Sequence, residues 1–352
     1  MTSHPNRFAL LPVVGATLLA VAPTAALAAP AASTYEIVQR WQIGGTGGWD
    51  YLTMDSARHR LFISRGDHVD VLDTATGKVT ARISDTNGVH AVVLAEKLHR
   101  GYTTNGKSNS ITEFDLDSLT VLREVPIPAA NPDAALYEPA GNHLYVFNGK
   151  SHDALVLDAA TLGVVKKLPL PDKPEFAQDD GAGHVYVNIE SDKGQLVRIN
   201  AKTLLIDATW DLPGCATPSG LALDRQHARL FSVCDGNVMA VTDARTGHPV
   251  ATLAIGEGPD AAEYDATHAL VLSSNGGGTL SVIQQDGADH YRVAATLATQ
   301  KGARTMAFDP ATRRIYLVTS EFGPTPAPTA EQPHPRPPQV PGTFTVLVAE
   351  PR

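Results

Sequence analysis

The chain has 352 residues, with 28 Lys and Arg against 37 Asp and Glu, and its formal net charge is −9. An acidic chain repels phosphate backbones, so this composition disfavours duplex nucleic acid and anionic membranes as partners.

The first 28 residues have the features of a cleaved export signal. Arg7 precedes an apolar stretch from Phe8 to about Val21, and small residues follow as far as Ala26-Leu27-Ala28. This order predicts cleavage near Ala28 and a mature chain with a net charge of about −10. The stretch is too short for a membrane span, and no other stretch is long and apolar enough. We therefore expect a periplasmic or secreted protein with no membrane span in the mature chain.

A phrase of alternating polar and apolar residues recurs along the rest of the chain. The first copy reads WDYLTMDSARHRLFISRGDHVDVLDTATGKVTARI from Trp49. When the copies are aligned on the residue that opens each one, these residues stand at positions 50, 90, 133, 175, 219, 260 and 304. The spacing is 40 to 44 residues. Each copy contains short segments rich in Val, Leu, Tyr and Thr, separated by Gly, Asp, Asn and Pro. This period predicts four-stranded blades and an all-β, seven-bladed β-propeller over residues 35–352.

The seventh copy supplies only three strands, the last of them near Thr343–Glu350. A further strand is available at the other end of the mature chain, in Thr34–Gly45 (TYEIVQRWQIGG). We expect it to complete the last blade and close the ring, because closure pairs the exposed strand edges. The Pro-rich stretch Gly323–Gly342 lies inside this copy and predicts an extended loop, either a surface excursion or a lid over the channel.

Phrases such as HLYVFN, RIYLVT, VLDTATGKV and LDRQHARLF resemble those of the YncE-like, YVTN-type β-propeller family. The resemblance covers about Tyr35 to Arg352. It implies an exported seven-bladed propeller and assigns no reaction, since many such propellers have no assigned reaction. The blades also resemble, less closely, the lactonase-type seven-bladed propellers.

The residues at the entry of each inner strand are expected to form a ring around the mouth of the central channel, where propeller ligands usually bind. The loops between second and third strands share this face, and the Pro-rich loop leaves it. The predicted ligand-binding residues are Trp49, Asp50, His90, Asp133, Glu175, Ser219, Asp260 and Arg304 from the ring, Asn105, Asn148 and Glu190 from the second loops, and His334 and Arg336 from the Pro-rich loop.

Three chemistries fit this ring. The first is a divalent cation, such as Ca²⁺, Mn²⁺ or Zn²⁺, bound by Asp50, His90, Asp133, Glu175 and Asp260. The second is acid–base chemistry between facing carboxylates and His90. The third is binding of a polar small molecule or peptide without a reaction. Alternatively, such polar residues only cap turns, and the repeat multiplies them.

These chemistries give two functional hypotheses, and a third, a redox accessory protein, is disfavoured because the sequence has no haem motif C-x-x-C-H and no copper-binding His cluster. The first is a propeller that binds a small molecule, a metal ion or a periplasmic partner protein at the channel mouth. The alternative is a metal-assisted hydrolase or lactonase. No sequence motif such as H-E-x-x-H assigns a catalytic residue, so the sequence leaves catalysis open. We expect a monomer.

Two further sets of residues are interpreted as structural. Cys215 and Cys234 flank neighbouring strands in a chain predicted to be exported, which indicates a disulfide. Aspartates follow the third strands and precede Thr-Gly, Thr-Leu or Ser-Leu turns, and they are expected to hydrogen-bond the turn backbone. They are Asp73, Asp115, Asp158 and Asp243.

Overall fold

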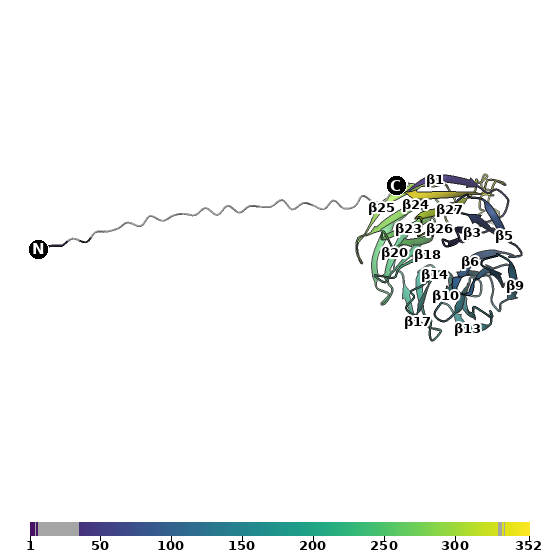
Figure 1. Ribbon diagram of the computed structural model, residues 1–352, viewed down its shortest axis with the longest axis horizontal. Helices are drawn as coiled ribbons and strands as arrows, with labels where there is room; N and C mark the ends of the chain where they lie inside the picture. Colours follow the sequence, from purple (N-terminus) through teal and green to yellow (C-terminus); the bar gives the residue numbers. More distant parts are fainter. Residues whose placement is uncertain (4, 6–34, 330–332, 334) are drawn as a thin grey trace. The chain divides into compact units, whose positions relative to one another are not determined.

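Seven antiparallel four-stranded sheets surround a central axis in the computed structural model of the protein (Figure 1). The structure describes residues 1–3, 5, 35–329, 333 and 335–352. The predicted all-β, seven-bladed propeller is therefore confirmed. Nearly all of the predicted signal peptide lies outside the described residues, so that prediction is not tested.

The strands of each blade run in sequence order from the channel outward, except in the last blade. The first four blades consist of β2 (Leu52–Asp55), β3 (Arg60–Ser64), β4 (Val69–Asp73) and β5 (Val79–Ile83); β6 (Val89–Ala95), β7 (Arg100–Asn105), β8 (Ser110–Asp115) and β9 (Val121–Pro126); β10 (Pro132–Glu138), β11 (His143–Asn148), β12 (Asp153–Asp158) and β13 (Val164–Pro169); and β14 (Lys173–Asp179), β15 (His184–Glu190), β16 (Gln195–Asn200) and β17 (Leu205–Asp211). The last three consist of β18 (Ala216–Asp224), β19 (Arg229–Asp235), β20 (Val238–Asp243) and β21 (Pro249–Ala254); β22 (Pro259–Asp265), β23 (Leu270–Asn275), β24 (Thr279–Gln285) and β25 (Tyr291–Ala298); and β26 (Met306–Asp309), β27 (Arg314–Thr319), β28 (Thr345–Pro351) and β1 (Tyr35–Gln42). One short 3₁₀ helix, η1 (Glu96–Leu98), occurs among the described residues.

The ring closes as predicted, because β1 pairs antiparallel with β28 as the outer strand of the seventh blade. Ile37 lies opposite Ala349, and Trp41 lies opposite Val346. The Tyr35 ring is 4% exposed and packs in the apolar cluster between the sixth and seventh blades. The Trp41 ring lies 5.7 Å from the ring of Tyr316. The two ends of the propeller sequence are thus joined by backbone pairing and by buried aromatic contacts.

The aspartates that follow the third strands form the predicted turns. The Asp73 carboxylate accepts hydrogen bonds from the Thr76 backbone N–H at 2.8 Å and from the Thr76 hydroxyl at 2.7 Å. These bonds lower the pKa of Asp73, because they stabilise the charged carboxylate. The same contacts recur at Asp115, Asp158 and Asp243. These aspartates are therefore structural, as the sequence predicted.

One carboxyl group on an inner strand lacks any partner. Glu263 lies on β22 and is partly buried, and its carboxyl group forms no hydrogen bond or ion pair with another residue in the described part of the chain. Burial raises the pKa of Glu263 from 4.5 to about 7. The folded protein therefore holds a proton that the unfolded chain releases between these pH values, so this group's contribution to stability falls as the pH rises through that window.

Glu263→Gln is expected to increase the free energy of unfolding by about 2–3 kcal/mol at pH 8 and to leave it nearly unchanged at pH 4, where the carboxyl is protonated in both states. Urea unfolding at the two pH values measures the difference. Glu257→Gln is the matched control, since Glu257 is exposed just before the same strand and should have little effect at either pH. Equal effects of the two substitutions at pH 8 would contradict the assignment of a buried, unpaired carboxylate.

Candidate functional site

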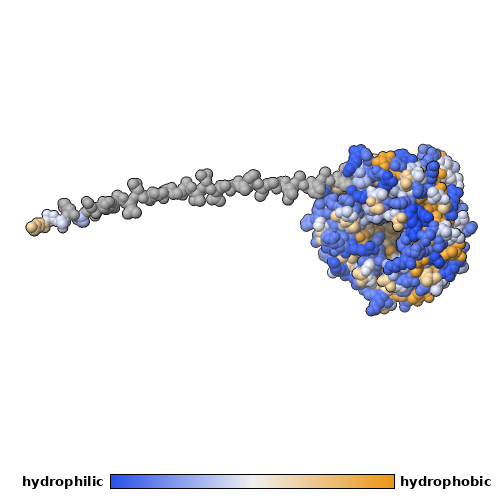
Figure 2. All heavy atoms as spheres, in the orientation of Figure 1, coloured by the Kyte–Doolittle hydropathy of each residue, from blue (hydrophilic) through white to orange (hydrophobic). Residues whose placement is uncertain are grey.

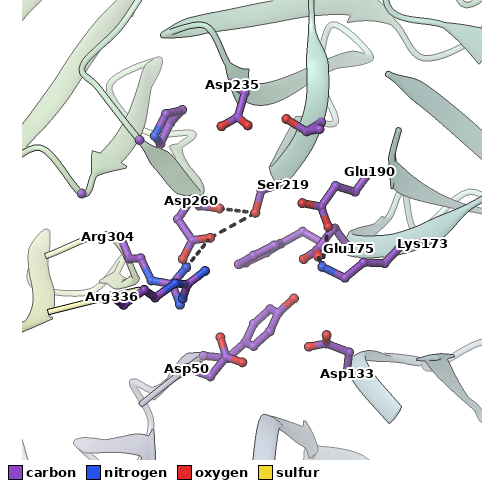
Figure 3. A pocket seen from close by; sticks show the side chains of 16 residues that line it. Asp50, Asp133, Lys173, Glu175, Glu190, Ser219, Asp235, Asp260, Arg304 and Arg336 are labelled. Carbon is purple, nitrogen blue, oxygen red and sulfur yellow. Dashed lines mark hydrogen bonds and ion pairs between the residues drawn. The ribbon is translucent and has the colours of Figure 1, made fainter. Parts of the chain in front are cut away.

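The channel opens on one face into a cavity of about 510 Å³. Figure 2 shows a face of the propeller that is hollowed near its centre. The lining comes from the entries of the inner strands and from the loops between second and third strands, which are the two loop classes expected at the mouth. Six acidic side chains line the cavity against three basic ones (Figure 3): Asp50, Asp133, Glu175, Glu190, Asp235 and Asp260 against Lys173, Arg304 and Arg336.

Two aromatic rings from opposite parts of the propeller contribute to the lining of this cavity. Tyr51, which leads into the inner strand of the first blade, and Phe176, on the inner strand of the fourth, have ring centroids 4.4 Å apart. Because these rings meet from blades that are not neighbours, they narrow the channel where it enters the mouth. The ligand space is therefore a pocket on one face.

Three of the predicted ring residues converge at this mouth, from the first, second and third blades. The His90 Nδ1 atom lies 2.6 Å from Asp50 Oδ2 and 3.5 Å from Asp133 Oδ1. The three potential donor atoms lie within 4.8 Å of one another. Backbone bonding fixes the entry of the first blade, since the Asp50 N–H donates to the Ser64 hydroxyl at 3.0 Å. This group has the size and composition of a metal-ligand set, here called the Asp–His–Asp cluster.

Burial and mutual repulsion change the proton affinities of this cluster. The pKa of Asp133 is raised to about 6, first because the carboxyl is buried and then because Asp50 is negatively charged, while His90 opposes the rise. Burial lowers the pKa of His90, but the hydrogen bond to Asp50 and the charge of Asp133 outweigh it and raise the pKa overall. Excess negative charge thus collects around His90, where a cation would stabilise both carboxylates.

Glu175 and Asp260 lie in the same cavity but have other partners. Lys173 Nζ lies 2.5 Å from Glu175 Oε1 and also pairs with Glu190. Burial, with the charge of Asp133 next in size, raises the pKa of Glu175 well above its usual range. On the other side, the Ser219 hydroxyl lies 3.2 Å from Asp260 Oδ1, and Arg304 Nη1 lies 3.6 Å from the same oxygen (Figure 3).

The remaining predicted residues are distributed differently. Trp49 lines an adjacent cavity rather than the mouth itself. Arg336 lines both cavities, so the Pro-rich loop reaches the mouth, whereas His334 lies outside the described residues. Asn105 and Asn148 are fully buried and line neither cavity. The Asn105 amide donates to Thr112 Oγ1 at 2.8 Å, and the Asn148 amide donates to Asp153 Oδ1 at 2.8 Å, so both are engaged inside their blades.

Sequence reasoning did not single out Lys173, Tyr51 or Phe176 as site residues. Each lies within two residues of a predicted ring position, Asp50 or Glu175. Lys173 is the first residue of β14 and lies opposite Glu190 in the sheet register. The sequence offered one signal for Lys173, since this basic residue stands two residues before the predicted ring carboxylate Glu175.

The predicted disulfide joins Cys215 to Cys234, with a Cα–Cα distance of 5.2 Å. It links the start of the fifth inner strand to the end of the neighbouring strand, next to Asp235 at the mouth. The pairing prediction is confirmed. No helix among the described residues is long and apolar enough to cross a membrane.

Comparison with known proteins supports the fold alone. No family model matches the chain, and no curated protein matches it. Among solved structures, a chain of a mitotic checkpoint complex matches with a TM-score of 0.72 at 12% identity, covering 97% of this chain and 99% of that chain. The WD40 repeats of RRP9 match with a TM-score of 0.72 at 10% identity, covering 90% and 97%. Hydrazine synthase of Kuenenia stuttgartiensis matches with a TM-score of 0.68 at 15% identity, covering 77% and 92%.

Proposed function

We propose that the protein is an exported propeller whose channel mouth binds a divalent cation and, beside it, a small polar molecule. The observation that carries this proposal is the Asp–His–Asp cluster, whose three donor atoms come from three successive blades and lie within 4.8 Å of one another. The cavity around it has twice as many acidic as basic lining residues, so a bound cation offsets unbalanced charge.

The donor set narrows the choice of cation. Calcium is normally held by six to eight oxygen atoms, whereas zinc and manganese accept imidazole nitrogen together with carboxylate oxygen. We therefore propose Zn²⁺ or Mn²⁺ in preference to Ca²⁺. Three protein ligands would leave at least one coordination position for a small polar molecule.

Titration of metal-free protein with ZnCl₂, MnCl₂ and CaCl₂ in a calorimeter tests the proposal. We expect one tight site for Zn²⁺ or Mn²⁺, weakened about 100-fold or more by Asp133→Asn and by His90→Gln, because each removes one of three ligands. Binding should weaken as the pH falls, because His90, whose pKa is raised, and then Asp133, whose pKa is about 6, take up protons that compete with the cation. Asp235→Asn is the matched control, because Asp235 lines the cavity outside the cluster. Absence of a stoichiometric site, or equal binding by Asp133→Asn, would refute the proposal.

A second function, a metal-assisted hydrolase or lactonase, is favoured by one further observation. Burial raises the pKa of Glu175, which lines the same cavity, and a raised pKa favours the protonated form that a general acid needs to donate a proton to a leaving group. A panel of esters and lactones incubated with the metal-loaded protein separates the two functions. Turnover that Asp133→Asn abolishes supports the hydrolase, and metal binding without turnover supports the binding protein.

The cellular setting belongs to the same proposal. The disulfide and the signal-like sequence before Ala28 support export, and the repeat phrases support kinship with the YncE-like propellers. The similar propeller of the mitotic checkpoint complex belongs to an assembly of proteins. A periplasmic partner protein is therefore the alternative to a small molecule as the ligand of this mouth.

A further inference from the structure

A second cavity of about 620 Å³ adjoins the channel mouth on the side of the seventh blade. Trp49, Phe322, Pro337 and Gln339 contribute to its lining. Arg304 and Arg336 line this cavity and the mouth alike, so they mark the boundary between the two. A ligand held at this boundary can extend into either compartment.

The two boundary arginines differ in how far other residues of the protein engage them. Among the described residues, Arg304 forms one ion pair, with Asp260 at 3.6 Å, and its side chain is 40% exposed. Arg336 forms no hydrogen bond or ion pair with another residue of the described chain. Both side chains approach the mouth from the same side (Figure 3). An anion that reaches both guanidinium groups would accept charge-assisted hydrogen bonds from each of them.

The second cavity presents flat apolar surface beside these charges. The Trp49 ring lies 5.3 Å from the Phe344 ring and 6.3 Å from the Phe322 ring, measured between centroids. Pro337 adds a further apolar surface. Aromatic walls of this kind favour a planar apolar group, because they provide large contact area in offset or edge-to-face geometry.

The segment that carries Arg336 is fixed at its base. The Gly323 N–H donates to the Pro338 carbonyl at 2.8 Å, and the Val340 N–H donates to the Glu321 carbonyl at 2.9 Å. Arg336 thus lies two residues from a backbone anchor, between prolines that restrict the backbone. Less conformational entropy is lost when a side chain on such a restrained backbone binds a ligand.

We infer that the mouth binds an aryl carboxylate: a small molecule with a planar aromatic body in the Trp49–Phe322 cavity and an anionic group between Arg304 and Arg336. The inference rests on the proposed function only in placing a small ligand at the mouth. It does not require the cation, because the arginines lie outside the Asp–His–Asp cluster.

Calorimetric titration with 2-naphthoate in the presence of EDTA tests this inference, with 2-naphthalenemethanol as the neutral analogue. The naphthoate is expected to bind at one site, about tenfold or more tighter than the alcohol. Arg304→Gln and Arg336→Gln should each weaken naphthoate binding by about tenfold while leaving binding of the alcohol unchanged. The matched control is Arg292→Gln, since Arg292 pairs with Asp286 on the outer strand of the sixth blade, and it should bind like the unmodified protein.

The outcomes separate this inference from the proposed cation site. Equal affinities for naphthoate and alcohol, no binding of either, or unchanged binding by both arginine variants would overturn the aryl carboxylate. Asp133→Asn should bind naphthoate normally in EDTA, even though it loses the cation. Binding of naphthoate without binding of metal would support the aryl carboxylate and refute the cation site. Binding of metal without binding of naphthoate would support the cation site and refute the aryl carboxylate.

Discussion

Deletion of Tyr35–Gln42 is expected to abolish cooperative unfolding of the propeller. The deletion removes the whole outer strand of the seventh blade, and with it the pairing to β28. It also removes Tyr35, which is 4% exposed, and the contact between Trp41 and Tyr316. Burial of each large aromatic side chain contributes about 2–3 kcal/mol, so the total loss is comparable to the 5–15 kcal/mol that stabilises a typical domain.

Circular permutation gives the matched control. A chain that begins at Ile43 and carries Tyr35–Gln42 after Arg352 through a short turn keeps every side chain while changing the covalent order. The turn is feasible because Tyr35 lies opposite Pro351 in the sheet. The permutant should unfold cooperatively in urea, followed by circular dichroism and tryptophan fluorescence, whereas the deletion variant should not. A deletion variant as stable as the full chain would show that closure contributes little.

The success of the fold prediction has a local cause. Each blade repeats the same alternation of strand and turn residues, so the signal accumulates over seven copies even though each segment is short. Closure by the N-terminal strand followed because the seventh copy lacked one strand and Tyr35–Gln42 was the unassigned segment. The turn aspartates were predictable for the same reason, since their hydrogen bonds reach only two or three residues along the chain.

The site was only partly predictable, because its pairings join different blades. The repeat indicated that Asp50, His90 and Asp133 occupy equivalent positions in successive blades. Equivalent positions in a propeller lie on the same face, so the three residues could be predicted to meet at the channel mouth. It did not indicate that Lys173 would reach Glu175, which depends on side-chain length and on the register of β14. Asn105 and Asn148 were expected in loops but are the last residues of β7 and β11, where their amides turn into the blade. A shift of one residue at a strand end reverses the side to which a side chain points.

Loss of the Cys215–Cys234 disulfide is expected to lower the free energy of unfolding by about 3 kcal/mol, because the bond closes a loop of about 20 residues in the unfolded chain. Urea unfolding with and without reductant measures the change. Cys215→Ala/Cys234→Ala should match the reduced protein and should not respond to reductant, which separates loss of the bond from other effects of the reductant. Unchanged unfolding of the reduced protein would contradict this expectation.

Loss of the Cys215–Cys234 disulfide should also change the backbone conformation at the channel mouth. Thr217 lines the cavity two residues after Cys215 and has a positive φ of 45°, a conformation that β-branched residues rarely adopt. Its N–H donates to the Ser191 carbonyl of the fourth blade at 2.9 Å, so the strained residue is held between this bond and the disulfide. Without the disulfide, Thr217 can relax. Loss of the disulfide should therefore accelerate amide exchange at Thr217 and Ser219 more than at Leu270–Asn275 in the sixth blade. An equal acceleration of exchange in both segments would show that the disulfide stabilises the fold without shaping the cavity.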